Sequence, residues 1–160
     1  CETQQHRCHV VNGEELCDQC NKERLEMEQD NNEALHQFYA DIITTGIEEN
    51  GWVCSWAQLS RYGFASCETS DDVIVDIIAL AEGGVDGYEC PITINIDTIE
   101  DAFDMLFEAM KSYKKDDIGL SSDYVGSIIS ARMNLDAGEI DTELASYITQ
   151  LGIFGKVHYS

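Results

Sequence analysis

The residues best suited to chemistry lie at the start of the sequence. Four cysteines and two histidines fall within the first twenty residues, and two of the cysteines form a Cys-x-x-Cys pair. Zinc takes four nitrogen or sulfur ligands in a tetrahedron, and such a pair commonly supplies two of them. The pair directly precedes a predicted helix, whose first N–H groups favour thiolate charge. The candidate ligands are Cys1, His6, Cys8, His9, Cys17 and Cys20.

The preferred ligand set is Cys8, Cys17 and Cys20, with one further ligand from His6 or Cys1. Cys8 and its neighbour His9 are not expected to share an ion, because the side chains of adjacent residues point in different directions. Four protein ligands would make the zinc structural, with no open position for a catalytic water. Disulfides among these cysteines and unligated thiols are the alternatives that the sequence leaves open.

The order of these residues resembles a treble-clef-type zinc knuckle. Within residues 1–24, a Cys-His pair is followed by an Asn12-Gly13 turn and then by the stretch LCDQCN. In that family a hairpin is followed by a Cys-x-x-Cys pair at the start of a helix. The first half departs from the pattern, because its spacing is Cys-x6-Cys or His-x-Cys. The resemblance implies a structural zinc ion in a small knuckle.

The charge of the chain limits its partners. The sequence holds 31 acidic residues against 9 Lys and Arg, a net charge of −22 at pH 7. Such a surface disfavours contact with nucleic-acid phosphates or with an anionic membrane. A basic protein surface is the favoured partner, because complementary charge accelerates encounter. The plain alternative is that the charge only aids solubility.

Two sets of acidic residues recur at helical spacing. On a helix each set would form a ridge, in which neighbouring carboxylates repel by a few tenths of a kcal/mol per pair. A step of four residues rises by about 6 Å, close to the separation of phosphates along a nucleic-acid strand. Both ridges are therefore predicted to bind a basic partner, and an ordinary solvated face is the alternative. The ridges are Glu100, Asp104 and Glu108, and Glu26, Asp30 and Glu33.

The rest of the sequence gives no recognisable catalytic group. Cys54, Cys67 and Cys90 lie among apolar residues and are predicted to be core residues. His36 and His158 have no catalytic signature around them. No phosphate-binding glycine loop or calcium loop is present. The sequence therefore predicts a non-enzymatic protein, with a thiol-based hydrolase or redox enzyme as the minor alternative.

The predicted fold class is α+β and mainly α. A zinc knuckle in residues 1–24 would precede an acidic helical domain in residues 25–160, with short strands near 89–96 and 155–159. Apolar periodicity predicts helices over 21–49 and 98–115, the latter capped by Asp97. Two further helices are predicted to begin at Ser121 or Ser122 and at Asp141. Shorter helices are predicted over 55–63 and 70–83, although the β-branched run in the second also suits a strand.

The sequence contains no run of about 18 apolar residues and no basic-then-apolar leader. Its seven cysteines are an odd number and it has no Asn-x-Ser/Thr acceptor, so a reducing compartment and a cytoplasmic protein are expected. In size and charge the chain resembles the acidic nucleic-acid-mimic inhibitors of phage and mobile elements, of the antirestriction or anti-CRISPR type. That resemblance implies binding to a basic surface of a nucleic-acid-handling protein, which would be inhibited or regulated. The alternative is a zinc-stabilised adaptor or accessory subunit of a transcription or assembly complex.

Overall fold

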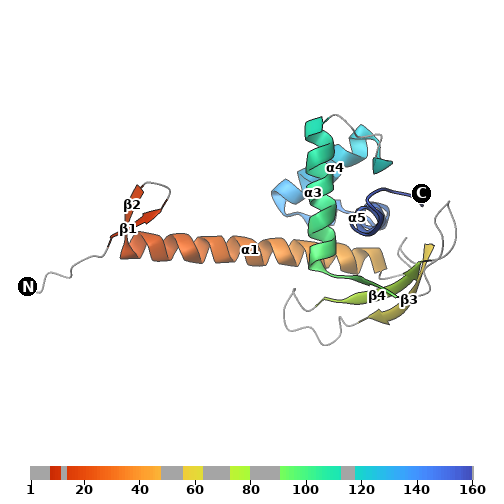
Figure 1. Ribbon diagram of the computed structural model, residues 1–160, viewed down its shortest axis with the longest axis horizontal. Coiled ribbons are helices and arrows are strands. Elements are labelled where there is room, and N and C mark those ends of the chain that lie inside the picture. Colours follow the sequence, from red (N-terminus) through yellow and green to blue (C-terminus); the bar gives the residue numbers. More distant parts are fainter. Residues whose placement is uncertain are drawn as a thin grey trace, which may run out of the picture. The chain divides into compact units, whose positions relative to one another are not determined.

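The structure is a computed structural model that describes residues 8–11, 14–47, 56–62, 73–79, 91–112 and 118–159. The described part is mainly helical and contains a small antiparallel sheet, in agreement with the predicted class (Figure 1). The chain divides into two compact units, Cys1–Leu35 and His36–Ser160. The boundary falls inside the first helix, so each unit is described separately.

The first unit contains a hairpin and the beginning of a long helix. β1 (Cys8–Val11) pairs antiparallel with β2 (Glu14–Cys17), as the Asn-Gly turn predicted. α1 (Asp18–Ile47) follows β2 without an intervening loop. It begins three residues earlier than predicted and continues unbroken through Gly46.

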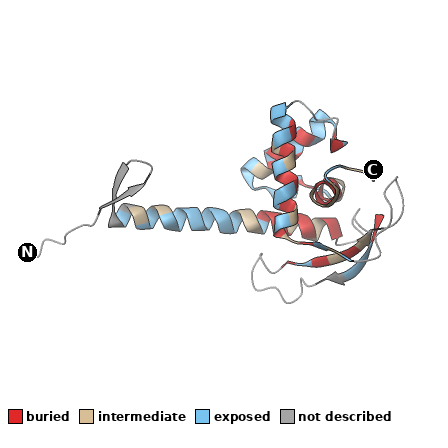
Figure 2. Cartoon of the chain, viewed as in Figure 1, coloured by how far each residue is buried: buried red, intermediate tan, exposed pale blue. Residues whose placement is uncertain are grey.

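The burial of α1 changes along its length. Residues 25–34 are all exposed, whereas residues 38–40 and 42–43 are buried (Figure 2). The exposed part has no apolar stripe, and its side chains pair with one another at four-residue spacing instead. Each such pair stabilises a helix by about 0.2–0.5 kcal/mol. The pairs are Gln19–Glu23, Lys22–Glu26, Arg24–Glu28 and Gln29–Glu33.

The core of the second unit is formed by α1's last turns and three further helices. α3 (Ile96–Ser112) packs against α5 (Thr142–Phe154) and α4 (Ser122–Asn134), which is followed by the short 3-10 helix η5 (Ala137–Glu139). The rings of Phe38, Tyr39 and Phe103 lie 5.5–5.9 Å apart between centroids. Aromatic contacts at this separation add to the stabilisation from burial.

A three-stranded antiparallel sheet, in the order β3-β4-β5, replaces both of the shorter predicted helices. β3 (Ala57–Tyr62) lies within the helix predicted over 55–63, which is therefore wrong. β4 (Val75–Ala79) lies within the helix predicted over 70–83, so the alternative strand is correct there. In β4, Val75 and Ile77 are buried while Asp76 is half-buried, the alternation of a strand with one covered face. β5 (Ile92–Ile94) confirms a strand within 89–96, with residues 89–90 outside the described part.

The predicted helix caps are correct for α4 and α5 and wrong for α3. The side chains of Ser121 and Asp141 accept hydrogen bonds from the first turns of α4 and α5. α3 is capped by Asn95 instead of Asp97: its Oδ1 accepts from the Thr98 backbone N–H at 3.1 Å, and Thr98 Oγ1 accepts from the Asn95 N–H at 3.3 Å. This reciprocal pair is a capping box, which leaves Asp97 in the first turn, beside the positive helix end.

The strand predicted over 155–159 is also wrong. α5 ends at Phe154 with Gly155 as its C-cap, and residues 157–159 belong to no helix or strand. The buried side chain of Gln150 takes the place of a partner strand. Its Oε1 accepts from the backbone N–H groups of His158 (2.9 Å) and Tyr159 (2.8 Å), and its Nε2 donates to the Tyr159 carbonyl (2.9 Å).

Gln150→Leu is expected to lower the free energy of unfolding by about 2 kcal/mol, because the leucine leaves these partly buried backbone groups without partners. The matched control is Gln29→Leu, since Gln29 is exposed on α1 and donates to Glu33. That change should stay within about 0.5 kcal/mol of the parent protein. Urea denaturation of both variants tests the difference, and equal midpoints would contradict this role for Gln150.

Candidate functional site

The strongest feature of the second unit is the acidic face of α3. At about 100° per residue, its five acidic residues fall within an arc of about 100°. All five are exposed, and the arc extends along about 16 Å of helix. The opposite side of α3 carries the buried residues Ile99, Phe103 and Leu106. The acidic face consists of Asp97, Glu100, Asp101, Asp104 and Glu108.

The carboxylates of this face differ in whether they have a hydrogen-bond or ion-pair partner. Glu108 accepts from the Lys111 ammonium at 2.7 Å, and both side chains are more than 70% exposed. This contact is the main cause of the raised Lys111 pKa. In the described part of the chain, the carboxylates of Glu100, Asp101 and Asp104 make no hydrogen bond or ion pair. Three carboxylates are therefore free to accept from a partner without breaking an internal contact.

An arginine and a tyrosine lie beside the acidic face. Arg132 Nε donates to the Tyr39 hydroxyl at 2.9 Å, and its guanidinium lies 5.4 Å from the Tyr39 ring centroid. Burial is the main cause that raises the pKa of Tyr39; Glu100 and Asp104 raise it further, while the Arg132 hydrogen bond and charge lower it. Glu100 and Asp104 thus add a smaller contribution that disfavours ionisation of this tyrosine.

We expect the free energy of unfolding to depend on pH in the alkaline range because of Tyr39. Its pKa is higher in the folded state, so near pH 10 the unfolded chain loses the proton first and stability falls as pH rises. The pKa of Tyr147 is also raised, mainly by burial and then by its hydrogen bond to Glu143. This shift likewise lowers stability as pH rises. We expect Tyr39→Phe to reduce the loss of stability between about pH 9 and 11. Chemical denaturation across this range measures the slope, and an unchanged slope would contradict the assignment.

The second predicted ridge lies on the exposed part of α1. Glu26, Asp30 and Glu33 are all exposed. Glu26 pairs with Lys22 at 3.6 Å, and Glu33 accepts from Gln29 at 3.0 Å. Two of the three carboxylates in this ridge are therefore engaged within the helix. The ridge offers a partner fewer free acceptors than the acidic face of α3.

The proposed metal ligands are placed only through the backbone. In the β1–β2 ladder, Cys8 lies directly opposite Cys17, and Cys20 lies in the first turn of α1. His9 pairs with Leu16, at the alternate register position. The side chains of these residues, and all of residues 1–7 with Cys1 and His6, lie outside the described part. Among the residues whose side chains are described, no group of three metal-ligating residues occurs.

The structure adds residues that sequence reasoning missed. Asp97 and Asp101 belong to the acidic face, and a helical projection at 100° per residue could have included them. Arg132 lies 93 residues from Tyr39, and no local pattern signals that contact. The predicted core cysteines, Cys54, Cys67 and Cys90, lie outside the described residues.

The described surface also has an open hollow of about 710 Å³ beside α4. Polar and small residues line it, which differs from the apolar walls that typically enclose a small-molecule ligand. Its lining residues are Ser122, Asp123, Gly126, Ser127, Ser130 and Glu139.

Within the described ranges, no helix has the length and apolarity needed to cross a bilayer. Comparisons with protein-family models, with curated proteins and with solved structures give no match for this chain.

Proposed function

We propose that this chain is a non-enzymatic binding protein whose acidic face on α3 contacts a basic surface of a nucleic-acid-handling protein. Binding would inhibit or regulate that partner by occupying the surface that it uses for phosphates. The observation that carries this proposal is the acidic face itself, with five exposed carboxylates along one side of a helix. The net charge of −22 adds long-range attraction to a cationic partner.

The arrangement on α3 is unfavourable for the isolated protein. Acids four residues apart, such as Glu100 with Asp104 and Asp104 with Glu108, each destabilise a helix by about 0.2–0.5 kcal/mol. A cationic partner would relieve this repulsion. The other side of α3 packs in the core, so the carboxylates are held on a rigid element before binding. Such preorganisation reduces the conformational entropy lost on association.

Titration against a panel of basic nucleic-acid-binding proteins tests this function. We expect binding to at least one member at about 50 mM salt and a large loss of affinity at about 300 mM, because salt screens interactions between exposed charges. An acidic protein of similar size is the control for charge alone. Indifference to every basic protein at low salt would overturn the proposal.

The hairpin favours a second candidate function, a zinc-stabilised adaptor. Directly opposed residues in an antiparallel pair have Cα atoms about 4.5–5.5 Å apart and share one face, so Cys8 and Cys17 occupy compatible positions. Cys20 follows at a helix start, where thiolate charge is favourable. Three cysteines would thus supply zinc ligands, with His6 or Cys1 as the fourth. A zinc ion would fix the hairpin to the beginning of α1.

Metal analysis of the purified chain tests the zinc site. One zinc per chain, lost in a Cys17→Ser/Cys20→Ser variant and retained in Cys54→Ser, would support it. The Cα separation of Cys8 and Cys17 also suits a disulfide. A chain without metal, whose mass shows a disulfide or free thiols, would therefore rule out the adaptor in this form.

A further inference from the structure

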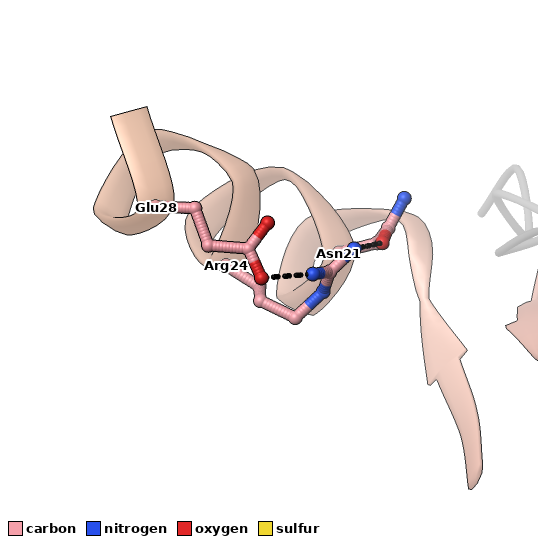
Figure 3. A network of polar contacts seen from close by, with 3 residues as sticks. All are labelled: Asn21, Arg24 and Glu28. Atoms are coloured by element: carbon pink, nitrogen blue, oxygen red, sulfur yellow. Dashed lines mark hydrogen bonds and ion pairs between the residues drawn. The ribbon is translucent and has the colours of Figure 1, made fainter. Parts of the chain in front are cut away.

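Two arginines with described side chains use their guanidinium groups differently. Arg24, in the first unit, has both terminal nitrogens engaged within α1: Nη1 forms an ion pair with Glu28, and Nη2 donates to Asn21 Oδ1 at 3.3 Å (Figure 3). Arg132, on α4 of the second unit, donates through Nε to the Tyr39 hydroxyl at 2.9 Å. Within the described ranges, its Nη1 and Nη2 have no hydrogen-bond or ion-pair partner. These two charged donors therefore remain available to a further acceptor.

The guanidinium of Arg132 is held in a fixed place. It lies 5.4 Å from the centroid of the Tyr39 ring and 6.0 Å from that of the Phe103 ring. The two rings are buried and stack on each other, with 5.5 Å between their centroids. A planar guanidinium that is bonded along one edge and packed over rings presents its Nη edge in a defined direction. Such a donor loses little conformational entropy when it binds.

The same guanidinium borders the acidic face of α3. Phe103, over which it lies, directly precedes Asp104 and follows Glu100 by three residues on that helix. Within the described part, neither carboxylate forms an ion pair with Arg132. This side of the second unit therefore combines carboxylates that have no internal partner with one fixed cation that also has two free donors.

This mixed charge pattern restricts the surfaces that can bind. A partner surface made only of Lys and Arg would place a like charge against Arg132, which is unfavourable. A carboxylate at that point would instead accept two parallel hydrogen bonds from Nη1 and Nη2, the geometry that a guanidinium fork matches.

We propose that Arg132 is a specificity-determining residue that pairs with an Asp or Glu carboxylate on the partner's otherwise basic surface. This inference rests on the proposed function, in which the acidic face of α3 binds that basic surface. It narrows the partner to proteins that carry a carboxylate beside the Lys and Arg residues that the acidic face contacts.

The first test compares Arg132→Gln with Lys111→Gln in the full chain. Both changes remove one positive charge near the acidic face, so charge alone predicts tighter binding to a basic partner for each. Lys111→Gln also frees Glu108, and we expect it to bind up to about 3-fold more tightly. Arg132→Gln is expected to bind about 10-fold more weakly, because it loses a charge-assisted bidentate pair. Isothermal titration at about 50 mM salt against the partner identified in the panel measures both.

The pairing and the proposed function can fail separately. If the parent chain binds a basic protein and Arg132→Gln binds it as tightly or more tightly, the pairing is overturned and the proposed function stands. If the parent chain binds no basic protein, the proposed function is overturned and the pairing fails with it.

The second test uses the unaltered chain, so it does not depend on the folding of a variant. Nitrogen-15 NMR follows the Arg132 side chain as the partner is added. Rotation of an unpaired guanidinium averages its terminal nitrogen signals, whereas a bidentate carboxylate slows this rotation. We expect separate Nη1 and Nη2 signals in the complex. Averaged signals in a saturated complex would overturn the pairing, whatever the affinities show.

A double-mutant cycle then identifies the carboxylate. Each Asp or Glu on the partner's basic surface is changed to Asn or Gln and measured with the parent chain and with Arg132→Gln. We expect one position whose effect largely disappears in Arg132→Gln, because residues in direct contact are not additive. Additive effects at every position would overturn the proposal.

Discussion

Gly152→Ala is expected to lower the free energy of unfolding by about 3 kcal/mol or more, the largest effect of any single substitution considered. Gly152 lies in α5 where that helix meets the first turn of α3. A Cβ atom at this position would lie 2.0 Å from the Thr98 carbonyl oxygen and 2.9 Å from its Cγ2. Backbone on both sides of the contact would have to move, so α3 could not keep its present position against α5.

Gly126→Ala is the matched control, because Gly126 is also a helical glycine but is exposed on α4. A Cβ atom there would have no neighbour within 4 Å. The change should stabilise the protein by about 0.5–1 kcal/mol, because alanine favours the helix more than glycine does. Urea denaturation measures both variants. A Gly152→Ala protein as stable as its parent would show that α3 and α5 do not approach this closely.

The second large effect concerns binding. A variant that neutralises three carboxylates of the acidic face is expected to bind a basic partner about 100-fold more weakly at low salt. It combines Glu100→Gln, Asp104→Asn and Glu108→Gln. The substitutions keep the size and shape of the side chains, and all three residues are exposed, so folding should be retained. Isothermal titration against the partner identified in the panel measures the change, and circular dichroism checks the fold.

The exposed part of α1 supplies a control with the same composition. The control variant combines Glu26→Gln, Asp30→Asn and Glu33→Gln, so it also loses two glutamates and one aspartate. Because Glu26 and Glu33 are already engaged within the helix, this variant should lose much less affinity than the α3 variant. Equal losses would mean that net charge, instead of the acidic face of α3, controls binding. A larger loss for the α1 variant would place the interface on the first unit.

Local sequence signals were sufficient where a helix depends on its own residues. The apolar positions of α3 and the caps of α4 and α5, Ser121 and Asp141, could be predicted from spacing and residue type. They were insufficient where distant segments decide the structure. β4 has the punctuation of a helix, but pairing with β3 and β5 buries Val75 and Ile77 on one face and makes it a strand.

Long-range side-chain contacts were also beyond prediction. The C-terminal segment has strand-like residues, yet the amide of Gln150 accepts from its backbone N–H groups, and no pattern in the sequence indicates that pairing. Helical spacing predicted the step of four between Glu100, Asp104 and Glu108. Whether their carboxylates were free depended on contacts such as that between Glu108 and Lys111, which the structure supplies.

Competition with nucleic acid is the direct test of whether the acidic face of α3 occupies the phosphate-binding surface of a basic partner. A labelled DNA duplex is bound to the basic partner, and its release by this protein is followed by fluorescence anisotropy. We expect full, competitive displacement by the parent protein and little displacement by the Glu100→Gln/Asp104→Asn/Glu108→Gln variant. A ternary complex, in which the partner holds the DNA and this protein together with unchanged affinities, would contradict it.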